Sequence, residues 1–249
     1  MTALRPLLLA VQFLTRFPVP LRAAPNPREL GRSVLYYPLV GLLLGASLAG
    51  LQQLLATVPP LVQAALVLAV WSGITGFLHL DGLADSADAW VGGQGGRERT
   101  LAIMKDPRCG PAGVAAVVLL LLLKFAALAS LAEAGPNTAL LAAPLLGRVA
   151  VLALFASTPY VRPGGLGAAM AAELPRRSAW GVVAASWLLC GLLLDAAAWW
   201  LSVLVLAGLW LGLRTALLRR LGGTTGDTAG ATLELTEAAV LFTALLANH

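Results

Sequence analysis

Three aspartates gather in "GFLHLDGLADSADAW" (residues 76–90), a stretch that is otherwise mostly apolar. Asp81, Asp85 and Asp88 are spaced i, i+4 and i+7, which places them on one face of a helix. Like charges at this spacing destabilise a helix, and more so at the end of a membrane span, unless a cation lies between them. Carboxylate oxygens suit Mg²⁺ or Mn²⁺ rather than zinc. The spacing predicts a divalent-metal site; a solvated helix end is the alternative.

A second acidic set lies in "GDTAGATLELTEAAVLF" (residues 226–242). Asp227 and Glu234 share a helical face, and Glu237 lies one turn further on. Glu234 and Glu237 fall inside an apolar run, where an acid marks a functional site and needs a partner. That partner is either a metal ion shared with the first set or the basic residues of neighbouring runs, Lys124 and Arg148.

Several residues near these acids are candidates to bind a phosphate-bearing substrate: His79, Lys105, Arg108, Lys124, Arg148, Gly226 and Glu237. The glycines of "GGTTGD" (222–227) let backbone N–H groups approach an anion, although no G-K-[ST] follows, so this is not a Walker A loop. The alternatives are structural. His79 can cap a helix, Lys124 can extend toward the membrane surface, and Arg148 can pair with a buried acid.

The elements that must hold these residues are membrane-spanning helices. Of the 249 residues, 59% are hydrophobic and 12% are charged, whereas a soluble domain has about 25% charged residues. We expect an all-α polytopic integral membrane protein with one domain over 1–249. An interfacial or re-entrant helix in segment 1–33 precedes seven spans of roughly the length that a transmembrane helix needs. The spans are 34–57, 60–78, 113–133, 138–159, 179–194, 196–216 and 231–247, with a tight turn near Asp195; one bent span plus an interfacial helix is the alternative for 179–216.

The basic residues assign the two sides of the membrane. When the loops are placed alternately on the two sides, one side receives every Lys and Arg of the 17 except Lys124 and Arg148, which lie within spans. The positive-inside rule places this side, with loops 79–112 and 219–230, in the cytoplasm, and the C-terminus outside. We expect a bacterial inner-membrane protein with its site at the cytoplasmic face. Topology explains the net charge of +5, so no nucleic-acid partner is expected.

Metal-binding carboxylates, cations and glycine loops on one membrane face indicate phosphoryl or nucleotidyl transfer, because metal and cations neutralise charge that develops on a diphosphate. The chain also resembles the adenosylcobinamide-GDP ribazoletransferases, or cobalamin 5'-phosphate synthases. The string H-L-D-G-L-A-D-[ST]-A-D joined to M-K-D-x-R-x-G is specific to that family, although its acidic string ends D-G more often than the "DAW" found here. The resemblance rests on "FLTRFPVP" (13–20), "YYPLVG" (36–41), "HLDGLADSADAW" (79–90), "MKDPRCGPAG" (104–113), "LLLK" (121–124), "GR" (147–148) and "GGTTGDTAGATLELTE" (222–237).

This resemblance implies the last assembly step of the cobalamin nucleotide loop. The reaction joins adenosylcobinamide-GDP and α-ribazole, or its 5'-phosphate, and gives adenosylcobalamin, or its 5'-phosphate, and GMP. The expected cofactor is Mg²⁺ on the diphosphate, and one carboxylate or a metal-bound hydroxide takes the proton of the ribose hydroxyl. The expected partners are the two substrates and the lipid bilayer, and the sequence allows a homo-oligomer. The implied metal ligands are Asp81, Asp85, Asp88, Asp227 and Glu234, of which the first three are the catalytic candidates.

Two other functions compete with this one. CDP-alcohol phosphotransferases also carry aspartates after D-G, but their pattern continues A-R and then G-x-x-x-D-x-x-x-D. Here Asp85 stands where that pattern would continue toward A-R, and the distal aspartates are missing. A secondary transporter could use the in-span Glu234, Glu237, Lys124 and Arg148 as a coupling relay. Transporters usually show internal repeats, and none is visible in this sequence.

Overall fold

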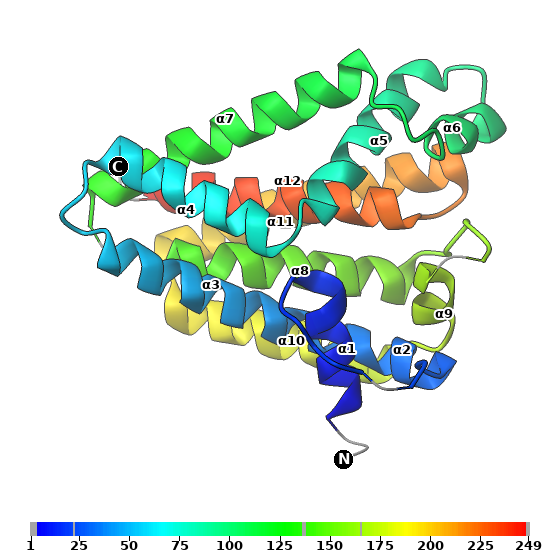
Figure 1. Cartoon of the computed structure of the whole chain (residues 1–249), viewed down its shortest axis with the longest axis horizontal. Coiled ribbons are helices and arrows are strands. Elements are labelled where there is room, and N and C mark those ends of the chain that lie inside the picture. Colours follow the sequence, from blue (N-terminus) through cyan, green and yellow to red (C-terminus); the bar gives the residue numbers. More distant parts are fainter. Residues whose placement is uncertain (1–3, 22, 136–137, 165, 248–249) are drawn as a thin grey trace.

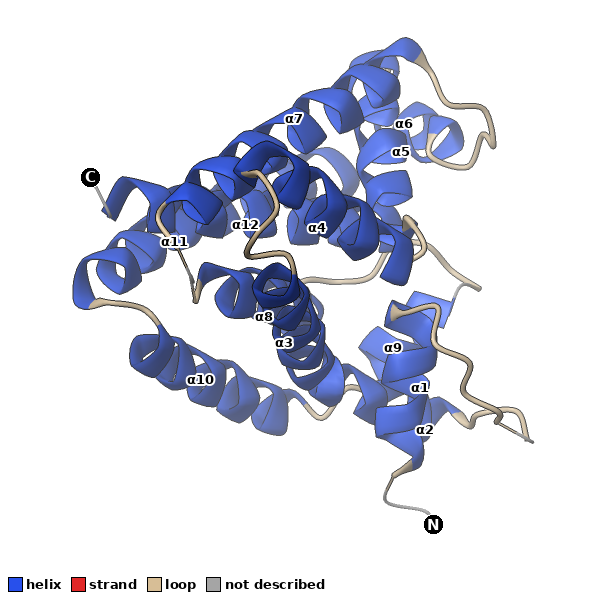
Figure 2. Ribbon diagram, turned by 60° about the vertical axis from the view of Figure 1, so that its left-hand side comes forward, coloured by secondary structure: helices blue, strands red, loops and turns tan. Residues whose placement is uncertain are grey.

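The computed structural model describes residues 4–21, 23–135, 138–164 and 166–247. Within these ranges the regular structure is helical, apart from one isolated β-bridge between Tyr160 and Thr224 (Figure 2). Most of the long helices run along the longest axis of the molecule (Figure 1). In chain order the helices are α1 (Arg5–Leu14), α2 (Pro27–Ser33), the 3₁₀ helix η1 (Val34–Tyr36), α3 (Tyr37–Leu54), α4 (Pro60–Ile74), α5 (Leu78–Gly92), α6 (Arg97–Ile103), α7 (Pro111–Glu133), α8 (Ala139–Ser157), α9 (Leu166–Ala172), α10 (Arg176–Leu193), α11 (Ala196–Leu221) and α12 (Gly226–Ala247).

Helix α8 is the centre of the bundle. It packs against α3, α10 and α12, and 94% of its apolar window is buried inside the protein, against 17% for α11. A helix that is apolar all round and still exposed suits a lipid environment. The contrast therefore identifies α8 as the core helix and α11 as a peripheral one, and the predicted all-α membrane fold is confirmed.

Within the described residues, five helical segments are long and apolar enough to cross a membrane: Pro27–Leu54, α7, α8, α11 and α12. The pair α4 and α5 adds a sixth if the two helices are counted as one broken span. Seven spans were predicted. Helix α10, which has 18 residues and begins with Arg176 and Arg177, is the predicted span that does not belong to this set. The predicted turn at Asp195 is present, and the Asp195 side chain accepts a hydrogen bond from the Ala198 amide at the start of α11.

A sharp bend between α4 and α5 sets the direction of the acidic helix. The two helices meet at 87°, and Gly76 and Phe77 adopt left-handed backbone conformations with φ of 62° and 61°. The N-terminal segment braces the bend, since the Arg16 amide donates to the Ile74 carbonyl at 2.7 Å. Hydropathy predicted one span over 60–78. The structure instead ends α4 at Ile74 and turns α5 away from it.

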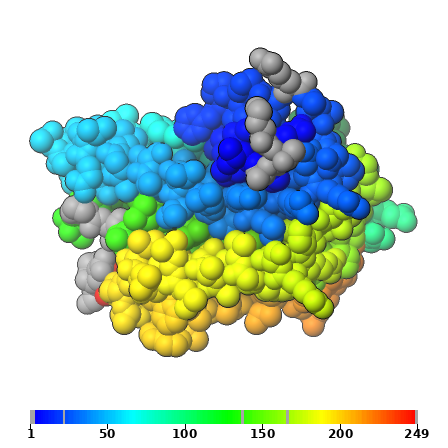
Figure 3. Space-filling view, turned by 90° about the horizontal axis from the view of Figure 1, so that it is seen from below, coloured from blue at the N-terminus to red at the C-terminus, as the bar shows by residue number. Residues whose placement is uncertain are grey.

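The N-terminal segment forms a short helix, as expected for an interfacial element. With 10 residues, α1 is about 15 Å long, half the thickness of a bilayer core. Its Arg5 forms an ion pair with Glu29 of α2 at 3.1 Å, and Asn26 and Glu29 form a capping box at the start of α2. In the space-filling view this segment (blue) and α10 (yellow) lie on the same face of the molecule (Figure 3).

Candidate active site

Two glycines bring the two acidic helices together. A side chain at Gly82 of α5 would lie 2.7 Å from the carbonyl oxygen of Asp227, and one at Gly230 of α12 would lie 3.3 Å from the backbone of His79. Glycine at such a crossing lets helix backbones approach closely. Since Gly82 follows Asp81 directly and Gly230 lies three residues after Asp227, the crossing holds the first acidic set beside the start of the second.

Three of the predicted acids meet at this crossing. Asp81 and Asp227 line one pocket of about 140 Å³, together with His79, Gly226 and Tyr37. We call it the acidic pocket. Asp85 lies within electrostatic range of both aspartates. Asp81 is exposed and the other two are half-buried, so their oxygens can reach a ligand from solvent.

His79 also belongs to this pocket, but it is buried, with 5% of its surface exposed. It lies in the first turn of α5, directly after the bend. Its Nδ1 finds no hydrogen-bond partner in the described part of the chain. A buried polar atom without a partner is costly, so His79 stays a candidate to contact a substrate.

Arg162 is a site residue that sequence reasoning missed. Its guanidinium donates to Asp227 Oδ2 at 2.7 Å, and both side chains are partly exposed. The loop that carries Arg162 is tied to "GGTTG": Thr224 N–H donates to Pro159 at 2.8 Å, and Val161 N–H donates to Thr224 at 2.9 Å. The only signal in the sequence is a basic residue in a short loop between two spans.

The "GGTTG" loop (222–226) has mainly a structural function. Gly222 ends α11 with φ of 73°, and a side chain at Gly223 would collide with the Pro159 carbonyl. The Thr225 hydroxyl accepts from the Thr228 amide in the first turn of α12. Of the predicted phosphate-binding loop, Gly226 lines the acidic pocket, and its contact with phosphate stays a prediction.

Asp88 holds the start of α7. Its two carboxylate oxygens accept hydrogen bonds from Gly110 N–H at 2.6 Å and Gly113 N–H at 2.8 Å. Side chains at either glycine would collide with this carboxylate. An acid at a helix N-terminus satisfies unpaired amides and the helix dipole. Asp88 therefore caps α7 from another helix, and its role as a metal ligand stays a prediction.

Lys105 and Arg108 lie in the loop between α6 and α7, and both are exposed. The Arg108 guanidinium donates two hydrogen bonds to Asp106, at 2.9 and 2.7 Å, and the Arg108 amide donates a third at 3.1 Å. These bonds hold the pKa of Asp106 at about 2, so the pair stays charged over the whole physiological range. The loop between α6 and α7, which carries both residues, lies near α5 and α6 at one end of the molecule, and phosphate binding by Lys105 and Arg108 stays a prediction (Figure 1).

The in-span acids are paired with the in-span cations. Lys124 Nζ lies 2.5 Å from Glu234 and 2.6 Å from Glu237, and Arg148 donates to the other oxygen of Glu237. All four side chains are buried, and Lys124 also lies 4.7 Å from the Trp71 ring centroid. The sequence predicted either a shared metal ion or Lys124 and Arg148 as partners of these acids, and in the structure the partners are Lys124 and Arg148. We call these four residues the buried ion cluster.

The five predicted metal ligands are therefore not gathered in one place. The described residues contain no group of three or more His, Cys, Asp or Glu side chains that could hold a metal ion by themselves. Glu234 is held by Lys124, and Asp88 caps α7. The remaining acids, Asp81, Asp85 and Asp227, share the crossing of α5 and α12. The charges of Lys124 and Arg148 are likewise taken up by glutamates rather than directed to the pocket.

Known proteins similar to this chain are found over nearly its whole length. Residues 6–245 match the family model described as cobalamin-5-phosphate synthase. The adenosylcobinamide-GDP ribazoletransferase of Stutzerimonas stutzeri (strain A1501) is 60% identical over 95% of this chain and 96% of its own length. Those of Pseudomonas aeruginosa (strain UCBPP-PA14) and Pseudomonas putida (strain W619) are 57% and 56% identical, over 96% and 98% of this chain and 97% and 99% of theirs. No solved structure matches the chain.

Proposed function

The chain belongs to the cobalamin-5-phosphate synthase family, and we propose that the crossing of α5 and α12 is where it carries out the family's reaction. It is a ribazoletransferase that joins adenosylcobinamide-GDP with ribazole. The family match separates this activity from the two competing functions, a CDP-alcohol phosphotransferase and a transporter. The observation that carries the proposed site is the glycine crossing, which brings Asp81 and Asp227 to one pocket.

The proposed chemistry is a phosphotransfer. A ribose hydroxyl oxygen of α-ribazole, or of its 5'-phosphate, attacks the phosphorus that carries cobinamide. A new P–O bond forms to ribazole, the P–O bond to GMP breaks, and the hydroxyl proton is lost. We assign the uptake of this proton to Asp81, which is exposed and lines the pocket, or to Asp85, which is half-buried within electrostatic range of Asp81 and Asp227.

Mg²⁺ is the cofactor that fits this donor set. Magnesium is usually held by one or two carboxylates together with water and substrate phosphates, rather than by a cage of protein ligands. Asp81 and Asp227, with Asp85 near both, offer hard oxygen donors of this kind, so a cluster of three ligands is not required. When bound, Mg²⁺ supplies positive charge against the diphosphate. Asp81 and Asp227 would hold it, with Asp85 as a further ligand or as the base.

Arg162 is the cation that we assign to the diphosphate, because it is already bonded to Asp227 at the pocket. Arginine matches the geometry of phosphate oxygens through paired N–H donors. Lys105 and Arg108 remain candidates on the exposed loop. Lys124 and Arg148 are reassigned to the buried ion cluster, since their charges are neutralised by Glu234 and Glu237 in the protein interior.

The chain is a membrane protein, and we propose that its pocket faces the cytoplasm of the bacterial inner membrane. The support is the distribution of the basic residues, since all but Lys124 and Arg148 of the 17 lie on one predicted side. Arg162, Lys105 and Arg108 belong to that side. The nucleotide substrate is then on the side where nucleotides are made.

The test is a GMP-release assay on the full chain in nanodiscs, with both substrates, with and without Mg²⁺. We expect Asp81→Asn and Asp227→Asn to lower kcat by at least about 100-fold, the cost of removing one group that stabilises transition-state charge. Glu98→Gln, an exposed acid on α6, is the matched control for loss of one carboxylate charge. Undiminished turnover in Asp81→Asn, or turnover independent of Mg²⁺, would overturn the assigned site while leaving the family activity intact.

A further inference from the structure

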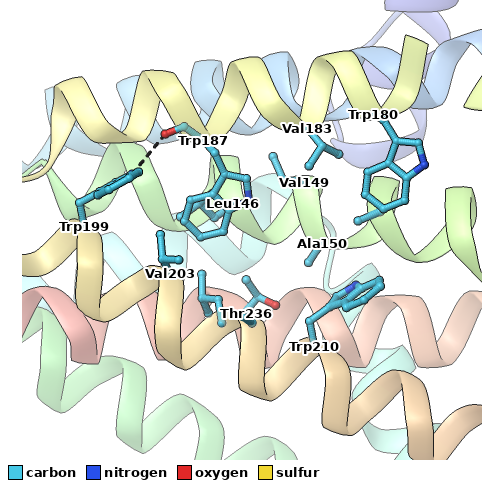
Figure 4. Close-up of a pocket in the computed structure, with 13 residues that line it drawn as sticks. Leu146, Val149, Ala150, Trp180, Val183, Trp187, Trp199, Val203, Trp210 and Thr236 are labelled. Atoms are coloured by element: carbon cyan, nitrogen blue, oxygen red, sulfur yellow. Dashed lines mark hydrogen bonds between the residues drawn. The ribbon is translucent and has the colours of Figure 1, made fainter. Parts of the chain in front are cut away.

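A second cavity lies between α10 and α11, with α8 behind it (Figure 4). Its volume is about 430 Å³ and its walls are almost wholly apolar. The hydroxyl of Thr236, which lines it from α12, donates to the Thr232 carbonyl at 2.7 Å and is thus satisfied. The cavity shares no residue with the acidic pocket. It is therefore a separate site on the far side of α8 and α12, bounded by a peripheral helix of the bundle.

Tryptophans stand at both ends of this cavity. Trp187 and Trp199 lie toward one end, where Trp199 Nε1–H donates to the Trp187 carbonyl at 3.3 Å. Trp180 and Trp210 face each other at the other end (Figure 4). Aliphatic side chains such as Val149 form the wall between them. Tryptophan has an apolar ring and one polar N–H, which suits the boundary between lipid chains and headgroups.

The end at Trp180 and Trp210 carries unpaired donors and positive charge. Trp210 Nε1 and Arg214 Nε are buried without a hydrogen-bond partner among the described residues, and Arg214 lies 5.7 Å from the Trp210 ring centroid. Arg177 precedes Trp180 by three residues on α10, and Arg214 follows Trp210 by four on α11, so each arginine lies one helical turn beyond its tryptophan. An anionic acceptor at this end would satisfy both donors and meet both charges.

The length of the cavity matches one leaflet of a bilayer. Trp199 and Trp210 are eleven residues apart on α11, which corresponds to roughly 16 Å along the helix. The hydrocarbon core of a bilayer is about 30 Å thick, so a leaflet contributes about half of that. An acyl chain that filled the cavity would put its headgroup at the arginine end, on the side that the basic residues assign to the cytoplasm.

We propose that this cavity binds one phospholipid from the cytoplasmic leaflet. One acyl chain lies between α10 and α11 against α8, and the phosphate accepts hydrogen bonds from Trp210 and Arg214. Aromatic and aliphatic side chains of α8, α10 and α11 flank this acyl chain, so this lipid exchanges more slowly than the lipids around the protein. The site holds α10 and α11 against α8 where side chains of the protein leave a gap.

The experiment is native mass spectrometry of the full chain, extracted from nanodiscs of equal phosphatidylglycerol and phosphatidylcholine and washed in detergent. We expect one phospholipid per chain to be retained. Ala150→Leu with Ala153→Leu fills the cavity from α8, and Ala207→Phe fills it from α11; each should lower the retained fraction at least fivefold. Ala115→Leu, at an exposed position of α7, adds the same side chain elsewhere and should change nothing.

A further variant tests the headgroup contact. Trp210→Phe keeps an aromatic, though smaller, ring and removes the indole N–H, and it should lower retention severalfold while GMP release, measured in parallel, reports that the protein is folded. Equal retention in the filled variants and in Ala115→Leu would show unspecific surface lipid only and would overturn the proposal. So would a wild-type protein that retains none, or a mass that corresponds to a second copy of the chain in place of lipid. If the double variant does not fold, Ala207→Phe decides alone.

Discussion

Gly82→Ala is the sharpest test of the glycine crossing, because it adds one methyl group where α5 meets α12. The new Cβ would lie 2.7 Å from the Asp227 carbonyl oxygen and 3.1 Å from its Cα. Both are backbone atoms and cannot rotate away. Since ordinary contacts begin at 3.4 Å, the two helices must separate by about 0.7 Å or more at the point that sets the spacing of Asp81 and Asp227.

The expected cost follows from that displacement. A misplacement of about 1 Å in catalytic geometry can lower a rate by roughly 100-fold, while overpacking in a helix interface costs about 1–3 kcal/mol of stability. Alanine is the better helix former by about 0.5–1 kcal/mol, so its helix propensity offsets part of the lost stability. We therefore expect kcat for GMP release to fall about 100-fold in a protein that still folds.

Two further glycines make the test quantitative. Gly208→Ala, in α11, meets nothing within 4 Å and should match wild type. Gly230→Ala meets the His79 backbone at 3.3 Å, a smaller overlap, and should give an intermediate loss. Each variant is assayed in nanodiscs with both substrates, and thermal unfolding in detergent reports its stability. If Gly82→Ala turned over within twofold of Gly208→Ala, the crossing would not set the catalytic geometry and the reasoning would be refuted.

Variants at three other residues, Asp88, Arg162 and Lys124, separate the roles that the structure assigns. Asp88→Asn keeps one acceptor for α7, so GMP release should stay within about tenfold of wild type, whereas Asp88→Ala should lower the unfolding free energy by about 0.5–2 kcal/mol in a denaturation experiment. Arg162→Gln removes a cation from the pocket and should lower kcat by about 100-fold in the GMP assay. Lys124→Met leaves a buried carboxylate unpaired and should cost about 3–5 kcal/mol; adding Glu234→Gln should restore part of it, read as a thermal shift.

The sequence predicted the helices that carry these acids, because the evidence for each helix is local. Asp81 and Asp85 have a one-sided spacing, and Asp227 stands just before an apolar run, so both features are visible in single segments. The role of Asp88 is not local. Its spacing is the same as that of a ligand, but its acceptor oxygens are taken by amides 22 and 25 residues away, and only the folded chain brings those amides to it.

The bend between α4 and α5 was missed for a related reason. Apolar residues continue through Ile74 to Leu78, and hydropathy measures how favourably a segment enters lipid, not the direction in which it runs. The bend depends on the left-handed Gly76 and Phe77 and on Arg16, which belongs to a distant segment. Arg162 was missed because nothing in its own loop indicates that Thr224 pairs with that loop across 60 residues of chain.

The acids of α12 lie at different depths along the helix, and the two deeper ones hold Asp227 in its position. Glu234 and Glu237 lie seven and ten residues after Asp227, roughly 10 and 15 Å further into the helix. There they join α12 to α7 through Lys124 and to α8 through Arg148. A slide of α12 by one turn, about 5.4 Å, would separate these buried charges, and each uncompensated charge would cost several kcal/mol. The register of α12 is thus set before substrate arrives, and with it the place of Asp227 beside Asp81. The group that can yield to an incoming phosphate is Arg162, whose loop is held by the backbone pair at Thr224 rather than by buried charge.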